Sequence, residues 1–175
     1  MSLAFHPLRV SSVERDADAL IVGLQVPQAL RDTFAFAAGQ YLTLRTFVDG
    51  QDLRRSYSLC SAPGEPDLKV GIRLLPGGAF SNWAIEHLHV GALLDVLPPL
   101  GRFNITLDPQ MGRHFLFVAA GSGITPMLSL IKTTLAIEPR SLCTLMYGNR
   151  RIATTMFRDA LAELKNRHLA RFAAH

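Results

Sequence analysis

The sequence predicts an antiparallel, Greek-key β-barrel followed by an incomplete α/β domain with a parallel sheet. Up to about residue 107, apolar and polar residues alternate, most clearly in Leu68–Leu74, and this pattern is typical of half-buried antiparallel strands. After Asp108 the pattern changes to a continuous apolar run, Phe115–Ala120, typical of a parallel strand that is covered on both faces. We therefore expect one domain over residues 1–108 and a second over residues 112–175.

Composition narrows the class of protein. The chain has 175 residues, 49% hydrophobic and 18% charged, so it can bury a core. No run approaches the roughly 18 consecutive apolar residues of a membrane span, and the amino terminus lacks the basic-then-apolar order of a signal peptide. We expect a cytoplasmic protein without a membrane partner. The net charge of +4 is spread along the chain, so we expect no nucleic-acid partner either.

Cysteines and histidines give no sign of a metal site. Cys60 and Cys143 lie in apolar or small-residue runs, which favours reduced, buried thiols over a disulfide. A 2Fe-2S centre of the usual type needs four cysteine ligands, and the chain has 2 cysteines. His87 and His89 have no third ligand nearby in the sequence, so we interpret them as loop histidines and expect no bound metal.

Short alternating runs predict the other strands of the first domain. They span Ala19–Val26, Tyr41–Phe47 and Leu93–Leu97. Turn-rich pieces separate the strands, such as residues 48–50 and 62–66, which contain glycine, proline or aspartate. The first half therefore has the strand and turn spacing of a small barrel.

The second half follows a strand-helix-strand order. Phe115–Ala120 leads through a glycine loop into a helix that ends near Ile137, and Leu142–Tyr147 is the next strand. A second helix is expected from about Thr155, and Leu169–His175 opens a third strand. Such a sheet would have an unpaired edge and too little apolar cover, so we expect that the chain is truncated relative to its parent protein.

The segment Arg55-Ser56-Tyr57-Ser58 carries the groups that a flavin needs. An arginine fork binds a phosphate or pyrophosphate in a bidentate manner, a tyrosine packs against an isoalloxazine ring, and a serine hydroxyl can reach a ring nitrogen. An exposed Arg-Tyr strand without a ligand is the alternative when this segment is taken alone.

A glycine turn follows the strand Leu68–Leu74. Gly77 and Gly78 lead into a helix at Ala79-Phe80-Ser81. The backbone N–H groups at such a helix start bind phosphate without a charged side chain, and the helix dipole adds to the attraction. A plain hairpin turn is the alternative.

A second glycine loop follows the buried strand, and its sequence is Gly121-Ser122-Gly123-Ile124-Thr125-Pro126. The glycines let the backbone approach a ligand, and Pro126 suits the first position of a helix that Thr125 caps. The loop is typical of pyrophosphate binding, although proline stands where the dinucleotide fingerprint has its third glycine.

Asn149, Arg150 and Arg151 follow the strand Leu142–Tyr147. An open nucleotide-binding sheet places here the residue that contacts the adenosine ribose, and a carboxylate would favour NAD. The sequence has no carboxylate at this point, and an arginine suits the 2′-phosphate of NADP. We expect NADP, with NAD as the alternative ligand and a solvent-facing basic loop as the alternative role.

In this order, the four segments resemble the ferredoxin-NADP reductase superfamily over essentially the whole chain. Arg55, Tyr57 and Ser58 meet the Arg-x-Tyr-Ser flavin motif of that family. The second flavin segment of the family resembles Gly71-Ile72-Arg73-Leu74 and the phosphate turn Gly78-Ala79-Phe80-Ser81, and the barrel-closing strand is similar to Pro99–Phe103. The phrases AAGSGITPMLSLI and LMYGNRR look most like the reductase components of phenylacetyl-CoA epoxidase systems.

The resemblance implies an FAD-dependent oxidoreductase module with FAD bound by residues 1–108 and a nicotinamide nucleotide bound by residues 112–175. It implies catalytic contacts of Tyr57 and Ser58 with the flavin ring. The implied phosphate and nucleotide contacts come from Arg55, Ser56, Gly71 to Leu74, Gly78 to Ser81, Ser122 to Pro126, Asn149 and Arg150.

The resemblance also implies a route for electrons. They would pass from NADPH through FAD to a 2Fe-2S cluster, which belongs only to the missing carboxy-terminal part, and then to an oxygenase component in the degradation of phenylacetate or related aromatics. A non-catalytic flavin-binding or docking β-barrel fragment is the alternative function.

Overall fold

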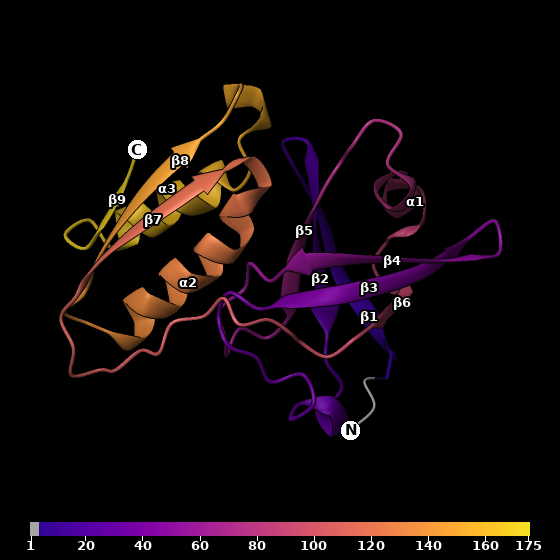
Figure 1. The fold of residues 1–175 in the computed structure, drawn as a ribbon, viewed down its shortest axis with the longest axis horizontal. Helices are drawn as coiled ribbons and strands as arrows, with labels where there is room; N and C mark the ends of the chain where they lie inside the picture. The colour runs from indigo at the N-terminus through magenta and orange to yellow at the C-terminus, as the bar shows by residue number, and fades with distance from the viewer. Residues whose placement is uncertain (1–3) are drawn as a thin grey trace.

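The computed structural model describes residues 4–175 as two sheets and three α-helices (Figure 1). The first sheet has six antiparallel strands in the order β4-β3-β6-β1-β2-β5. These strands are β1 (His6–Asp16), β2 (Ala19–Gln25), β3 (Tyr41–Val48), β4 (Gln51–Ser58), β5 (Leu68–Arg73) and β6 (Leu93–Val96). The chain just after β4 bridges back to β5 at Leu59 and Val70, so the sheet curls into the expected antiparallel barrel.

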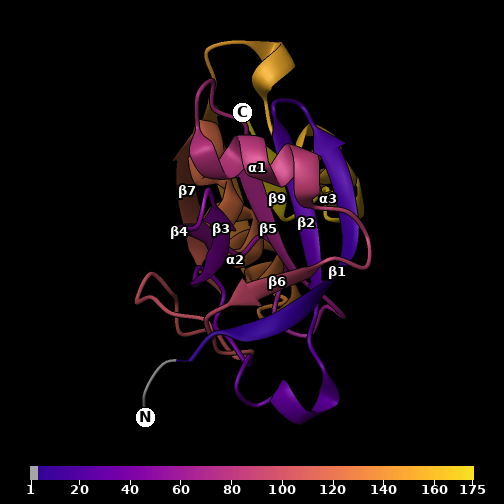
Figure 2. The ribbon, with the colours of Figure 1, turned by 90° about the vertical axis from the view of Figure 1, so that its right-hand side faces the viewer.

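Alternation along the strands fills the barrel. Leu42 and Leu44 of β3 and Val70 and Ile72 of β5 are fully buried, and burial of each such side chain stabilises the fold by about 1.5–3 kcal/mol. Helix α1 (Ala79–His87) packs across the barrel with Phe80 in its core (Figure 2). The barrel therefore fixes the positions of β4, β5 and the start of α1, which carry the expected flavin segments.

The second sheet has three parallel strands in the order β7-β8-β9. Its elements are β7 (His114–Ala120), α2 (Ile124–Ile137), β8 (Leu142–Gly148), α3 (Arg158–Arg167) and β9 (Phe172–Ala174). Short 3₁₀ turns occupy Gln28–Leu30, Gly121–Gly123 and Ile152–Thr154. The carboxyl ends of β7 and β8 meet, with Ala120 opposite Gly148, and this is the edge where open α/β sheets bind ligands.

The two helices cover one face of this sheet. Phe117 and Ala119 of β7 are buried in the core that α2 and α3 form, whereas Leu116 and Val118 are 66% and 64% exposed. The expectation that this strand is covered on both faces is therefore wrong for residues 4–175. The cause is geometric, because two successive right-handed crossovers in one direction place both helices on the same side.

Three further expectations need correction. The segment Pro99–Phe103 forms no strand, and only Leu100 makes a bridge, to Tyr41. Helix α2 begins at Ile124, so Pro126 is its third residue, and the Thr125 hydroxyl donates to the Ser122 carbonyl at 2.9 Å instead of capping the helix. His87 is the last residue of α1 and not a loop residue.

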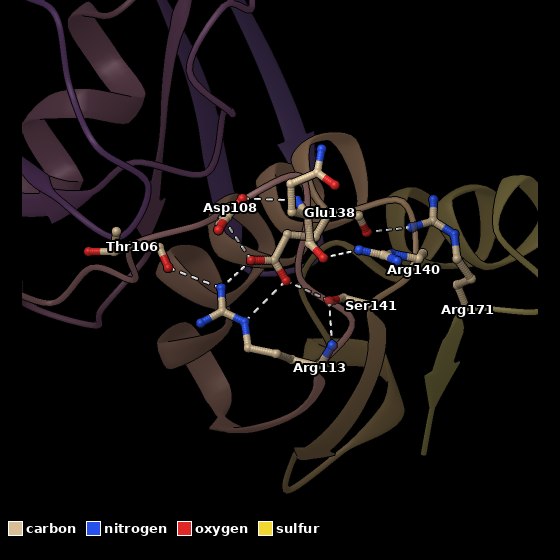
Figure 3. A network of polar contacts seen from close by, with 8 residues as sticks. Thr106, Asp108, Arg113, Glu138, Arg140, Ser141 and Arg171 are labelled. Carbon is tan, nitrogen blue, oxygen red and sulfur yellow. Dashed lines mark hydrogen bonds and ion pairs between the residues drawn. The ribbon is translucent and has the colours of Figure 1, made fainter.

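A buried carboxylate fastens the connection between the two sheets (Figure 3). Glu138 follows α2, its side chain is fully buried, and it pairs with the guanidinium of Arg113. The Asp108 backbone N–H donates to the same carboxylate at 3.0 Å, and the Ser141 hydroxyl donates at 2.5 Å. The Arg113 hydrogen bond, assisted by the other donors, lowers the pKa of Glu138 to about 2.

Helix α2 also joins the sheets by contacting the barrel. The Ser129 hydroxyl donates to the Ser61 carbonyl at 2.6 Å in a buried contact, and Lys132 pairs with Glu65 at 3.0 Å.

Cys60 and Cys143 are buried free thiols, as expected, and burial raises their pKa values to about 12 and about 11. None of the helices within residues 4–175 has the length and apolar character needed to cross a membrane.

Candidate functional site

Strand β4 presents the first part of the expected flavin segment. Arg55 and Tyr57 lie on the same side of β4 because side chains alternate along a strand. Arg55 is exposed, and its Nη1 donates to the Arg54 carbonyl at 2.7 Å. Burial raises the pKa of Tyr57 to about 12, so its hydroxyl stays protonated and can donate a hydrogen bond.

The serines of β4 lie on the opposite side. The Ser56 Oγ is 3.0 Å from the Thr43 Oγ1 on β3, so this hydroxyl already has a partner in the sheet. Ser58 is half-buried at the end of the strand, opposite Tyr41. Of these two serines, only Ser58 makes no side-chain hydrogen bond within residues 4–175.

A row of aromatic rings connects β4 to α1. The Tyr57 and Phe80 ring centroids are 5.6 Å apart, and the Phe80 and Trp83 centroids are also 5.6 Å apart. Trp83 then stacks on His87 at 5.3 Å with an interplanar angle of 8°. The Tyr57 ring thus packs against Phe80 of α1, the helix that begins at Ala79.

The start of α1 leaves backbone amides without partners inside the helix. Gly78 is the N-cap, and the Ala79 and Phe80 amides belong to the first turn, which has no intrahelical acceptors for them. The Ser81 hydroxyl is buried and holds the turn by hydrogen bonds to the Leu75 N–H and the Gly78 carbonyl, both at 3.2 Å. Ser81 therefore shapes the turn, and the first-turn amides are left as donors.

A groove of about 690 Å³ lies where the barrel meets the carboxyl ends of β7 and β8. Its walls combine Asp18, Arg73, Leu74, Leu75 and Pro76 of the barrel with Ala120, Gly121, Ser122, Gly148, Asn149 and Arg150 of the second sheet. It brings together five residues of the expected site: Arg73, Leu74, Ser122, Asn149 and Arg150.

At Gly121 the backbone of the loop after β7 passes close to the side chain of Arg73. Gly121 has a φ of +52°, and a β-carbon there would lie 2.8 Å from the Arg73 Nη1. The Tyr147 hydroxyl donates to the Gly121 carbonyl at 3.0 Å, and the Asp18 carboxylate pairs with Arg73 at 2.8 Å. A larger residue at position 121 would therefore disturb both the loop and the arginine.

Several expected site residues adjacent in sequence to the groove residues present no side chain to the groove. Ile72 and Ile124 are fully buried, and Thr125 is 3% exposed, so only their backbones can face a ligand. Gly71 faces the second sheet, where a β-carbon would lie 2.9 Å from the Met156 Cε.

Asp18 and Gly148 line the groove but were not among the expected site residues. The position of Gly148 at the carboxyl end of a parallel strand could have identified it. No local pattern marks Asp18, because its role depends on a pairing with Arg73, 55 residues away.

Comparisons with known proteins agree with this arrangement. Residues 9–105 match the family described as an oxidoreductase FAD-binding domain, and residues 117–174 match the family described as an oxidoreductase NAD-binding domain. The chain belongs to the ferredoxin reductase family. Its two sheets are accordingly the FAD-binding and NAD-binding domains of that family, as the four sequence segments predict.

Relatives within the ferredoxin reductase family include oxygenase components. The chain is 45% identical to a subunit of the 1,2-phenylacetyl-CoA epoxidase of Escherichia coli K12 and 37% identical to the ferredoxin reductase component of 3-ketosteroid-9-alpha-monooxygenase of Rhodococcus rhodochrous. Each alignment covers 94% of this chain and 46% of the relative. The chain thus spans about half the length of these relatives.

Solved structures share the fold. The cytochrome P450 reductase of Amycolatopsis has a TM-score of 0.78 at 28% identity, and the match covers 99% of this chain and 53% of that one. Ferredoxin-NADP⁺ reductase of Plasmodium falciparum with 2′P-AMP has a TM-score of 0.79 at 19% identity, and the match covers 98% and 72% of the two chains. The second likeness shows the fold alone.

Proposed function

We propose that this chain is the flavin-binding part of an NADPH-dependent reductase component, with residues 1–108 holding FAD and residues 112–175 belonging to the NADP-binding domain. The groove between the two sheets carries the proposal. It is lined by Arg73 and Leu74 of the barrel and by Ser122 and Arg150 of the second sheet, so one nucleotide could contact both domains at once.

The residues of the barrel fit FAD. The exposed Arg55 guanidinium and the first-turn amides of α1 offer donors to the pyrophosphate. The Tyr57 ring, braced by Phe80, offers a flat surface for the isoalloxazine, and Ser58 offers a hydroxyl. When bound, FAD would supply the redox chemistry by accepting a hydride from the nicotinamide and passing electrons onward.

The second sheet fits a nicotinamide nucleotide. The Gly121–Gly123 turn at the start of α2 offers backbone amides to the pyrophosphate. Arg150 is exposed at the rim of the groove and makes no ion pair within residues 4–175, so its guanidinium is available to a 2′-phosphate. We therefore favour NADP, and NAD remains the alternative ligand.

The acceptor is proposed from the relatives. The names of two of them place their proteins in an epoxidase and a monooxygenase, so we propose an oxygenase as the downstream partner, in the degradation of phenylacetate or a related aromatic compound. A 2Fe-2S cluster on the electron route would be bound elsewhere in the parent protein, because both cysteines of this chain are buried in domain cores. We propose a cytoplasmic location, where free thiols stay reduced.

Reconstitution with FAD tests the proposal. Purified chain mixed with FAD and then desalted should keep the flavin absorption bands, and failure to retain any flavin would overturn it. Addition of NADPH without oxygen should then bleach the bound flavin. A flavin that stays oxidised would support the alternative, a non-catalytic flavin-binding or docking barrel.

A further inference from the structure

The turn between β1 and β2 contacts the second domain directly through Asp16 and indirectly through Asp18, which pairs with Arg73 at the end of β5. The Asp16 Oδ2 accepts a hydrogen bond from the Phe157 backbone N–H at 2.5 Å, across 141 residues of sequence. The Asp18 Oδ2 accepts from the Arg73 Nε at 3.0 Å and from its Nη2 at 2.8 Å, and Arg73 reaches Gly121. In both views the indigo turn lies beside the gold segment that follows β8 (Figures 1 and 2).

Phe157 is an unusual point of attachment. Its φ of +59° is uncommon for a residue with a bulky side chain. Such a conformation persists where the surroundings over-determine it. Here the amide is held by Asp16, and the buried side chains of Met156 and Phe157 pack into the space above Gly71.

The hydrogen bond between Asp16 and Phe157 holds one end of the loop that carries Arg150, which lines the groove. The loop leaves the sheet at Gly148, which pairs with Ala120, and returns to the barrel at Phe157. Between these points Arg150 and Arg151 are exposed. The hydrogen bond to Phe157 therefore anchors one end of the loop that carries Arg150.

We propose that Asp16 is a positioning residue for the nicotinamide nucleotide. Its carboxylate holds the Phe157 amide and so keeps Asn149 and Arg150 at the rim of the groove. Asp16 does not line the groove, so it would act on the nucleotide only through the loop. The inference rests on the proposed function, since it needs a nucleotide in the groove.

The test compares variants of the full 175-residue chain. Asp16→Ala removes the acceptor, whereas Asp16→Asn keeps an oxygen that can accept from the same N–H. Glu14→Ala is the matched control, because Glu14 is an exposed carboxylate on the same strand and its side chain makes no hydrogen bond within residues 4–175. Asp16→Leu replaces Asp16→Ala if the alanine variant folds poorly, since leucine fills a similar volume without an acceptor.

Two measurements follow. Calorimetric titration with NADP⁺ should give a Kd about tenfold higher for Asp16→Ala than for the unaltered chain, because an amide that loses a charged acceptor leaves the loop in its binding conformation only part of the time. Asp16→Asn should restore most of the affinity, and Glu14→Ala should not change it. Hydrogen exchange of residues 149–157 should speed up in Asp16→Ala alone, while FAD retention stays unchanged in every variant.

The outcomes separate the two proposals. An equal Kd for the unaltered chain and Asp16→Ala would overturn the positioning role and leave the nucleotide site intact. Failure of the unaltered chain to bind NADP⁺ would overturn the nucleotide part of the proposed function and the positioning role with it. A loss of affinity in Asp16→Asn as large as in Asp16→Ala would also overturn the positioning role, because the charge, and not the hydrogen bond to Phe157, would then matter.

Discussion

The guanidinium of Arg113 donates two hydrogen bonds to the carboxylate of Glu138, whose side chain is fully buried. Arg113 stands at the start of β7 and also donates to the Thr106 carbonyl at 3.0 Å. Glu138 follows α2, and its own carbonyl accepts from Arg171 at 3.1 Å. An ion pair with a buried carboxylate thus ties the connection between the domains to the NAD-binding domain.

The pair of Arg113 and Glu138 makes the free energy of unfolding depend on pH. The pKa of Glu138 falls from an ordinary 4.5 to about 2 in the folded chain, mainly because of the Arg113 hydrogen bond. A depressed folded pKa stabilises the fold above pH 4.5, and this contribution disappears as the pH falls toward 2. Urea unfolding at a series of pH values should show the loss. Glu138→Gln should have a lower free energy of unfolding at neutral pH, and that free energy should change less between pH 4.5 and pH 2. Glu163→Gln alters an exposed ion pair and should follow the unaltered chain.

Arg55 should control the affinity for FAD. Arg55→Ala removes a proposed bidentate phosphate contact, so the Kd for FAD should rise by about 10- to 100-fold. Arg54→Ala is a close control, because Arg54 precedes it on β4 and pairs with Asp52 instead. Titration of the apoprotein with FAD gives both values. Equal effects of the two substitutions would argue against a specific role for Arg55.

Gly71 should be needed for the contact between the domains. A β-carbon at this position would lie 2.9 Å from the Met156 Cε and 3.3 Å from the Phe157 Cζ, so Gly71→Val should cost about 1–3 kcal/mol of the free energy of unfolding. Gly123→Ala should cost little through packing, because no atom lies within 4 Å of its β-carbon position and its φ is −62°. Denaturant unfolding of both variants compares them directly.

Arg150 should distinguish phosphorylated from unphosphorylated nucleotides. If its guanidinium contacts the 2′-phosphate, Arg150→Ala should weaken binding of 2′-phospho-AMP about tenfold and leave binding of AMP unchanged. Arg158→Ala, at an exposed position on α3, serves as the control. Calorimetry measures the binding of both ligands to the unaltered chain and to each variant. Tighter binding of AMP than of 2′-phospho-AMP by the unaltered chain would favour NAD.

Local patterns predict much of this fold. The short apolar runs at β2, β3, β5 and β6 match the observed strands within one or two residues, because one face of each strand points into the barrel. The other face of β2 is buried as well, with Ala19 and Ile21 packed in the core of the second domain. Strand β1 is not predicted in this way. Its alternation is interrupted by a register shift between Val10 and Ser12, so no continuous period-two run is visible there.

Contacts between distant segments could not be predicted from such patterns. The exposed face of β7 depends on where both helices pack, and the sequence of Phe115–Ala120 alone does not contain that information. Glu138 carries no motif, and its importance follows only from the donors that surround it. The candidate site segments can be proposed from sequence because glycine turns and arginines at fixed places along the chain are the features that phosphate binding requires.

The aromatic row behind Tyr57 gives the chain an optical reporter. Trp83 is its single tryptophan, and one ring, Phe80, separates it from Tyr57. Oxidised flavin absorbs in the range where tryptophan emits, so a flavin against Tyr57 would quench Trp83 fluorescence by energy transfer. Uptake of flavin could therefore be followed without any added label.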